Sequence, residues 1–396
     1  MAPPAGPIPA GTFKLAVLNA LCFVSIAIIT PVLDPLIRQR FGLGNQATGL
    51  FMAIHGAAAL AFGLVAGIIS DKLGRRTPLI VLGLLGSGLT TPLIPQIPSF
   101  RVLLVVRFLD GMFGALSLGL ILTRALDLAG PANRNRTMGV MSIAIAAGFL
   151  TAPILTGLIG PRSLKLLFGL VGAALMAGGF WMMSDLQRPE HIRPISGGPR
   201  AIARALYGRP RLALPVAFAF ADKFTFGTLA HLTSLAVKDL YGRGAVASSV
   251  AVFVFWVVFS STSVPGSRLA DRFGSVPTLI VGGALYGAAL AGLGWVGFGG
   301  FLAMMALAGG FCAIQYVPSV SLVGEIADPS ERGISMGVWN MAGSLGVVAG
   351  MIVSARLSAS GYALAYGVAG GLMILAAAGA AAALPLWRLG VRSAAR

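Results

Sequence analysis

Charged residues are scarce in this chain. Only 10% of its 396 residues are Asp, Glu, Lys or Arg, and only 12 are acidic. Soluble proteins carry about 25% charged residues. Because 57% of the residues are hydrophobic and the mean hydropathy is +0.88, the composition excludes an ordinary soluble domain and predicts an integral membrane protein.

Cysteine and histidine are also rare, with two and three residues. Both cysteines, Cys22 and Cys312, lie inside apolar runs, so neither a disulfide framework nor a metal site is indicated. The sequence also lacks a phosphate-binding loop and a nucleophile–base arrangement. We therefore expect no enzyme activity, no ATP-driven pumping and no cofactor. Residues 1–11 lack a charged leader region and a cleavage site, so we expect no removed signal peptide.

The charge that is present is strongly basic, with a formal net charge of +17. Nucleic acid would be one explanation, but the cations are scattered through the loops instead of forming a basic domain. We interpret them as topology signals and as an attraction to anionic lipid headgroups. The expected partners are membrane lipids, protons and a small-molecule substrate, and no nucleic acid.

Long apolar runs dominate the chain. Hydropathy predicts twelve membrane spans, at 13–37, 47–69, 78–97, 102–125, 138–160, 164–184, 212–237, 244–266, 277–298, 301–323, 334–357 and 361–386. An even number places both termini on one side, and most Lys and Arg residues then fall on that side. The positive-inside rule therefore predicts that both termini are cytoplasmic.

The longest polar segment divides the chain into two sets of six spans. We expect an N-terminal six-helix bundle over 1–184, a cytoplasmic linker with an interfacial helix over 185–211, and a C-terminal bundle over 212–396.

The two halves also repeat. The motif at 71–74 recurs at 271–274, and the pattern at 131–139 recurs at 329–337. In both cases the distance along the chain between the two copies is close to half the chain length, which indicates an internal duplication.

The hairpin between the second and third spans carries a distinctive motif. Its three cations place it on the cytoplasmic side. It resembles the loop 2–3 signature of the major facilitator superfamily, Gly-x-x-x-Asp-x-x-Gly-Arg-Arg/Lys, at Gly67, Asp71, Gly74, Arg75 and Arg76. The resemblance implies a conformational latch at the helix 11 N-terminus, with Asp271 and Arg272 as its counterpart in the second half. A solvated hairpin without a switching role is the alternative. A glycine such as Gly67 lets another helix approach closely.

The resemblance also implies the fold. It predicts an all-α integral membrane protein, with twelve transmembrane helices in two parallel six-helix repeats, the major facilitator fold. Substrate is then handled near the midplane between the repeats.

A charged pair lies in the fourth span. Arg107 and Asp110 are spaced i, i+3, so they can pair directly. With Gly111, Gly114 and Ala115 they resemble the superfamily's Arg-x-x-Gln-Gly-x-Gly-Ala-Ala motif, with Asp110 in place of Gln. A carboxylate beside this arginine suits proton coupling. A static ion pair that neutralises Arg107 is the alternative.

The fifth span contains Gly148-x-x-x-Ala152-Pro153-x-x-Thr156-Gly157. It resembles the Gly-x-x-x-Gly-Pro-x-x-Gly-Gly pattern of the superfamily's antiporter branch, with Gly148, Pro153 and Gly157 matching. The match favours export by exchange, whereas close helix packing by small residues is the alternative.

Three further charges lie inside predicted spans, where each needs a partner or a wet cavity. Asp34, between Pro31 and Pro35, either meets Arg107 or caps the helix in water, and the prolines should loosen the helix. Asp222 and Lys223 are near mid-membrane. Adjacent helical residues diverge by about 100°, so we expect no good pair between them and at least one facing a cavity.

Polar and aromatic residues provide candidates for a substrate cavity. With Lys223 they are Asn19, His231, Trp256, Tyr286, Gln315, Tyr316, Trp339 and Asn340. For His231 and for His55 in the second span, we favour a packing role with a hydrogen bond.

The sequence as a whole predicts a monomeric secondary transporter of a bacterial inner membrane. It works by alternating access, exports small amphipathic or cationic molecules, and uses Asp34, Arg107, Asp110 and Asp222 for proton coupling. One alternative is an importer or facilitator of a small organic anion, bound by Arg107 and Lys223. A further alternative is a non-transporting receptor or assembly factor.

Overall fold

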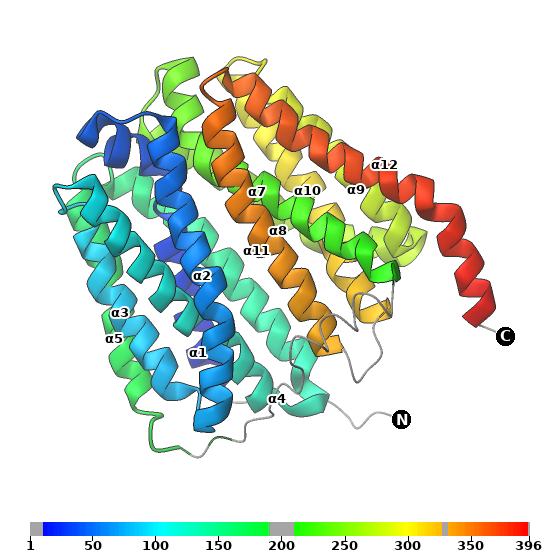
Figure 1. The fold of residues 1–396 in the computed structure, drawn as a ribbon, viewed down its shortest axis with the longest axis horizontal. Helices are drawn as coiled ribbons and strands as arrows, with labels where there is room; N and C mark the ends of the chain where they lie inside the picture. Colours follow the sequence, from blue (N-terminus) through cyan, green and yellow to red (C-terminus); the bar gives the residue numbers. More distant parts are fainter. Residues whose placement is uncertain (1–10, 189, 191–209, 327–331, 395–396) are drawn as a thin grey trace. The chain divides into compact units, whose positions relative to one another are not determined.

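The structure is a computed structural model that describes residues 11–188, 190, 210–326 and 332–394, and every regular element among them is helical (Figure 1). The first half contains α1 (Gly11–Ala27), η1 (Thr30–Val32), η2 (Asp34–Gln39), α2 (Asn45–Leu73), α3 (Thr77–Leu93), α4 (Phe100–Ile159) and α5 (Leu164–Met183). The second half contains η3 (Pro210–Leu212), α7 (Ala213–Tyr241), α8 (Ala245–Phe273), α9 (Ser275–Gly292), α10 (Phe298–Ile326), α11 (Arg332–Leu357) and α12 (Tyr362–Ala394).

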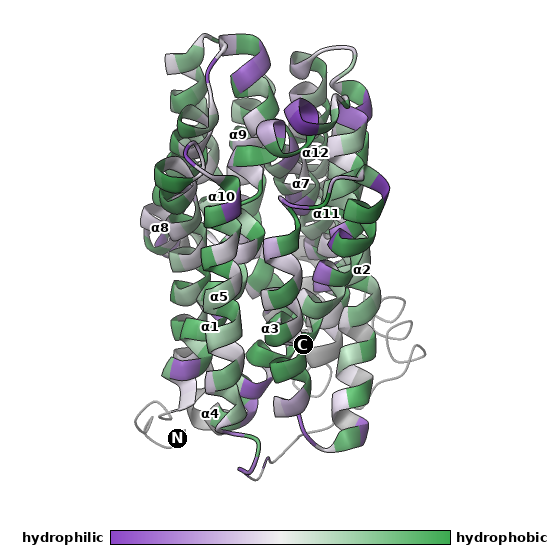
Figure 2. Ribbon diagram, turned by 90° about the vertical axis from the view of Figure 1, so that its left-hand side faces the viewer, coloured by the Kyte–Doolittle hydropathy of each residue, from purple (hydrophilic) through white to green (hydrophobic). Residues whose placement is uncertain are grey.

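The helices have the length and composition of membrane spans. Ten segments of the described chain are long and apolar enough to cross a membrane, including two within α4, Phe100–Leu128 and Val140–Ile159. Helix α3 is apolar but shorter, and α7 carries Asp222, Lys223 and His231 along its length. In Figure 2, where the ribbon is coloured by hydropathy, hydrophobic residues recur along every labelled helix and hydrophilic ones are sparse. The expected all-α membrane fold is confirmed.

Two predicted span ends differ in how the chain continues beyond them. The first span is not one regular helix: α1 ends at Ala27, and the chain continues through a tight turn and then a wide π-type turn. Pro31 and Pro35 lack the amide donors that a regular helix needs, so the expected loosening is confirmed. Helix α4, in contrast, continues through the connection expected between 125 and 138, so the spans predicted at 102–125 and 138–160 belong to one continuous helix.

The chain forms two compact units. One contains Met1–Ile195 and Arg243–Phe253, and the other contains Ser196–Gly242 and Val254–Arg396. Most of the expected linker, 191–209, lies outside the described residues.

Close helix packing in the second unit depends on glycine. A Cβ added at Gly346 would lie 2.3 Å from the carbonyl oxygen of Phe220, and one at Gly350 would lie 2.1 Å from that of Phe224. Only a residue without a side chain allows α11 to pack this closely on α7. In a membrane, where lipid tails offer no hydrophobic drive for association, such close backbone contact holds helices together.

Candidate functional site

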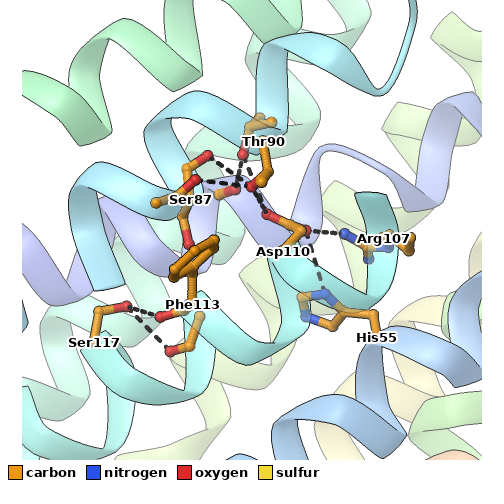
Figure 3. A network of polar contacts seen from close by, with 11 residues as sticks. His55, Ser87, Thr90, Arg107, Asp110, Phe113 and Ser117 are labelled. Atoms are coloured by element: carbon orange, nitrogen blue, oxygen red, sulfur yellow. Dashed lines mark hydrogen bonds and ion pairs between the residues drawn. The ribbon is translucent and has the colours of Figure 1, made fainter. Parts of the chain in front are cut away.

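A buried polar cluster in the first unit brings three helices together (Figure 3). Arg107 and Asp110 of α4 form an ion pair, which confirms the pairing expected from their spacing. His55 Nδ1 of α2 lies 3.3 Å from Asp110 Oδ2. From α3, the hydroxyls of Thr90 and Thr91 donate to Asp110 Oδ1 at 3.2 and 3.4 Å. Arg107 and Asp110 are only 2% and 4% exposed, so the charges are compensated inside the protein.

Packing of α2 against α4 places His55 in this cluster. A Cβ at Gly111 would lie 2.4 Å from the backbone oxygen of His55, so the glycine that follows Asp110 allows this close approach. The Arg107 guanidinium also lies over the Phe51 ring, 5.1 Å from its centroid. Both contacts fix the histidine and the arginine around the same carboxylate.

A small cavity, lined partly by polar side chains, adjoins the cluster. It is lined by His55, Asp110, Ser25, Ser87, Ser117, Cys22, Gly114 and three apolar residues, and its volume is about 20 Å³, enough for about one water molecule. Ligand pockets usually measure about 300–1,000 Å³. The cavity therefore suits water and protons better than a drug-sized molecule.

Our expectation for His55 as a packing residue missed this contact. The sequence places His55 on an apolar span, but it does not show that Asp110 of another helix lies against the ring. The available signal was a rare titratable residue at membrane depth.

The second unit contains a separate buried cluster around Asp222 of α7. Lys223 Nζ lies 3.1 Å from Asp222 Oδ2. The amide of Gln315 and the thiol of Cys312, both on α10, donate to Asp222 Oδ1. The neighbouring Thr225 hydroxyl is 2.8 Å from that of Tyr286.

The expectation that Asp222 and Lys223 do not pair was therefore wrong. Their Cα–Cβ bonds diverge, but the four-carbon lysine side chain is long enough to bring its ammonium back to the carboxylate. Lys223 also lies over the Tyr316 ring, 4.5 Å from its centroid.

The other cavity candidates are dispersed. Asn19 is fully buried and donates to the Met141 carbonyl at 3.4 Å. His231 is fully buried, and its Nδ1 lies 3.0 Å from the Ser354 hydroxyl, as a packing histidine would be. Asn340 is exposed.

Two more aromatic candidates lie near Lys223. Trp339 is buried, donates to Ser319 at 3.1 Å and packs against Tyr316. Trp256 packs between Phe226 and Phe259.

Asp34 is buried at the start of η2. Its carboxylate pairs with Arg38 at 3.4 Å and accepts a hydrogen bond from Gln39. It therefore has partners within its own helical turn.

The hairpin motif divides into buried and exposed parts. Gly74 adopts a positive φ of 63°, which glycine accommodates readily. Arg75 and Arg272 are exposed. A Cβ added at Gly67 would meet no described atom of its own unit within 4 Å. The side chains of Asp71 and Asp271 lie outside the described residues.

Arg76, in contrast, is 1% exposed and donates to Asp127 at 2.6 Å and to Ser70 at 3.0 Å. This arginine ties the hairpin to α4.

Glu190, which sequence reasoning missed, holds the start of α3. Its carboxylate accepts from the backbone amides of Arg76 and Thr77 at 2.7 and 3.1 Å, from the Thr77 hydroxyl and from Arg124. Burial alone would raise the pKa of Glu190. The bonds from Thr77 and Arg76 and the charge of Arg124 outweigh it, so the pKa lies below its usual 4.5. A carboxylate at a helix N-terminus is also favoured by the helix dipole.

The antiporter-like motif lies on the second span of α4. A Cβ at Gly148 would lie 2.7 Å from the Ala20 carbonyl oxygen of α1, whereas one at Gly157 would make only ordinary contacts from 3.4 Å. Pro153 is buried. Gly148 thus has the packing role that small residues have in membranes.

The chain resembles known transporters. A sequence profile of the Major Facilitator Superfamily matches residues 15–299 and 216–394. The multi-drug resistance efflux pump PmrA of Streptococcus pneumoniae is 24% identical over 280 residues, covering 66% of this chain and 67% of PmrA. The class G tetracycline resistance protein of Vibrio anguillarum is 26% identical over 343 residues, covering 83% and 85%. The structure of the nucleoside transporter NupG matches 94% of this chain and 98% of its own, with a TM-score of 0.75 and 16% identity. At that identity, the structural likeness shows the fold alone.

Proposed function

We propose that this chain, which belongs to the Major Facilitator Superfamily of membrane transporters, exports small amphipathic molecules in exchange for protons. Export is supported by relatives named as a multi-drug efflux pump and as tetracycline resistance proteins. The antiporter-like motif at Gly148, Pro153 and Gly157 supports the same direction. The transporter exposes its binding site alternately to the two sides of the membrane.

The observation that carries proton coupling is the carboxylate of Asp110. It is buried at membrane depth, paired with Arg107 and His55, and lines a small cavity that also holds serine side chains. An ionisable group inside a span is costly unless it is compensated, and such groups often form proton pathways. The cavity has room for about one water molecule beside the carboxylate, and we assign that water to proton transfer to the cluster.

Protonation of the cluster changes how Arg107 is held. When His55 is neutral, Arg107 is the cationic partner of Asp110. A proton on His55 gives Asp110 a second cationic partner, and a proton on Asp110 removes the charge that holds Arg107. Either event weakens the ion pair between Asp110 and Arg107. Because α2, α3 and α4 all contribute side chains to this cluster, the change affects the contacts among these three helices. We assign coupling to Arg107 and Asp110, with His55 as an added member.

Further assignments complete the proposal. Asp34 remains a candidate proton site at the start of η2. Asp71 and Asp271 act with the exposed Arg75 and Arg272 as conformational latches, and Arg76 anchors the first of them. The protein is a monomer of a bacterial inner membrane with both termini in the cytoplasm.

The test is transport in everted membrane vesicles, where export appears as uptake. With an imposed pH gradient, the wild-type chain should accumulate at least one compound of a panel that contains tetracycline, an aromatic carboxylate and a quaternary ammonium dye. Asp110→Asn should lower gradient-driven uptake at least tenfold while preserving substrate exchange without a gradient. Asp239→Asn is the matched control, because Asp239 is exposed and accepts from Tyr362 at the end of α7.

Two results would contradict the proposal. Gradient-driven uptake that persists in Asp110→Asn would remove Asp110 from coupling. Accumulation that is unaffected when the pH gradient is collapsed would remove proton exchange as the driving reaction.

A further inference from the structure

Two aromatic rings lie beside the ammonium of Lys223 in the second unit. Its Nζ lies 4.5 Å from the centroid of Tyr316 and 5.9 Å from that of Phe226. Trp256 and Phe259 of α8 complete the circle: Phe226 contacts Trp256, Trp256 contacts Phe259, and Phe259 contacts Tyr316, with centroids 5.3–6.1 Å apart. These rings and the lysine are partly exposed. They form a cationic centre within an aromatic wall, which we call the Lys223 ring.

The lysine is held in this position by its surroundings. Its stem passes α11 at Gly343, where an added Cβ would lie 3.0 Å from Lys223 Cγ. The side chain of Lys223 is 29% exposed, whereas that of Asp222 is 5% exposed. The pair therefore presents its positive member outward and keeps its negative member inside.

Asp222 is poorly suited to receive a cationic substrate. Its two oxygens already accept from Lys223, Gln315 and Cys312. A cationic molecule approaching the rings would also meet the like charge of Lys223. An ammonium has three donors, and the carboxylate of Asp222 accounts for one of them, so Lys223 keeps donors for an anion.

We propose that the Lys223 ring binds the carboxylate of a small aromatic acid, with Lys223 as the group that recognises the negative charge and the rings as the surface for its flat apolar part. The inference rests on the proposed function and narrows its amphipathic substrates to organic anions. A charge-assisted hydrogen bond to the ammonium supplies specificity, and ring stacking supplies contact area. Asp222 acts as the fixed counter-ion that stabilises the positive charge of Lys223 in the protein interior.

The experiment is equilibrium binding to the purified full-length protein in lipid nanodiscs, without a pH gradient. Three probes share one ring system: 2-naphthoate, the neutral 2-naphthamide and the cationic 2-naphthyltrimethylammonium. The wild-type chain should bind naphthoate most tightly. Lys223→Gln should weaken the binding of naphthoate at least tenfold, which corresponds to about 1.4 kcal/mol. Its affinity for naphthamide should stay within twofold of the wild-type value. Lys223→Arg, which keeps the charge, should retain most of the affinity.

Two further variants separate recognition from damage to the fold. Lys238→Gln removes an exposed lysine from the same helix and should change nothing. Asp222→Asn should strengthen naphthoate binding, because it leaves the charge of Lys223 uncompensated. Structural damage would weaken naphthoate binding in both Lys223→Gln and Asp222→Asn. The proposal instead requires weaker binding in Lys223→Gln and stronger binding in Asp222→Asn.

The proposal is overturned if naphthoate does not bind, if the cationic probe binds more tightly than naphthoate, or if Lys223→Gln binds naphthoate as the wild-type chain does. The ranking of the three probes on the wild-type chain needs no variant, so it decides the matter even if Lys223→Gln does not fold. Proton-driven export of a cationic or neutral compound that depends on Asp110 would leave the proposed function standing while this inference fails. Naphthoate binding without gradient-driven transport would support this inference and contradict the proposed function.

Discussion

Replacing Glu190 by Gln should loosen the start of α3. Gln keeps the shape of the side chain but loses the negative charge. In the wild-type chain this charged carboxylate accepts hydrogen bonds from the amides of Arg76 and Thr77 and from the guanidinium of Arg124. Hydrogen bonds to a charged group contribute about 1.5–3 kcal/mol, against about 0.5–1.5 kcal/mol for neutral pairs. The helix dipole adds about 0.3–1 kcal/mol. The side chain is only 7% exposed, so solvent screens these contacts weakly, and we expect a local loss of about 2 kcal/mol.

Hydrogen exchange measures this loss directly. A free energy of about 2 kcal/mol corresponds to exchange about 30-fold faster at the amides of Arg76 and Thr77, because 1.4 kcal/mol is a factor of ten. Local opening reports the stability of one segment without unfolding the whole protein. Glu325→Gln is the matched control: Glu325 is exposed and accepts from the Ser275 hydroxyl at 2.8 Å, and its change should leave α3 unaffected.

The pH dependence has a defined sign. The pKa of Glu190 in the folded protein lies below its ordinary value of 4.5, so its contribution to stability is complete above about pH 4.5 and is lost as the pH falls through the folded pKa. After correction for intrinsic exchange rates, protection at Arg76 and Thr77 should be constant from pH 7 to 5. If Glu190→Gln changes their exchange less than twofold, the assignment of Glu190 as the cap of α3 is wrong.

Further predictions concern packing and thiol access. Gly350→Ala should destabilise the protein by about 1–3 kcal/mol, the range found for overpacked cores, because the new Cβ would meet the Phe224 carbonyl oxygen. The control is Gly337→Ala on α11, whose added Cβ has no described neighbour within 4 Å. Thermal unfolding of Gly350→Ala should have a lower midpoint than that of this control. Cys22 and Cys312 are 6% and 7% exposed, so a maleimide should label them only on unfolding, and rapid labelling of the folded protein would contradict their burial.

Contacts within one helix were predictable from the sequence. The i, i+3 spacing of Arg107 and Asp110 predicted their ion pair, because helical geometry alone brings such residues together. The prolines at 31 and 35 predicted the irregular end of the first span for a similarly local reason. The motifs at the hairpin and in α4 identified the family, because each combines residue types with a fixed spacing.

Contacts between helices were not predictable in the same way. His55 lies far before Asp110 in the chain, and its place beside that carboxylate depends on how closely α2 approaches Gly111. Glu190 returns to α3 from the far end of the first half. The pairing of Asp222 with Lys223 depends on the rotamer of a long side chain, which spacing does not determine.

The sequence by itself determined that the chain is a membrane protein of two related halves, because hydropathy and spacing are properties of the chain alone. Only the tertiary structure decided which charges share a cluster. Helix rotation and closest approach depend on small residues such as Gly111 and Gly343, and a shift of one side-chain width would separate His55 from Asp110 or Lys223 from its ring of aromatics.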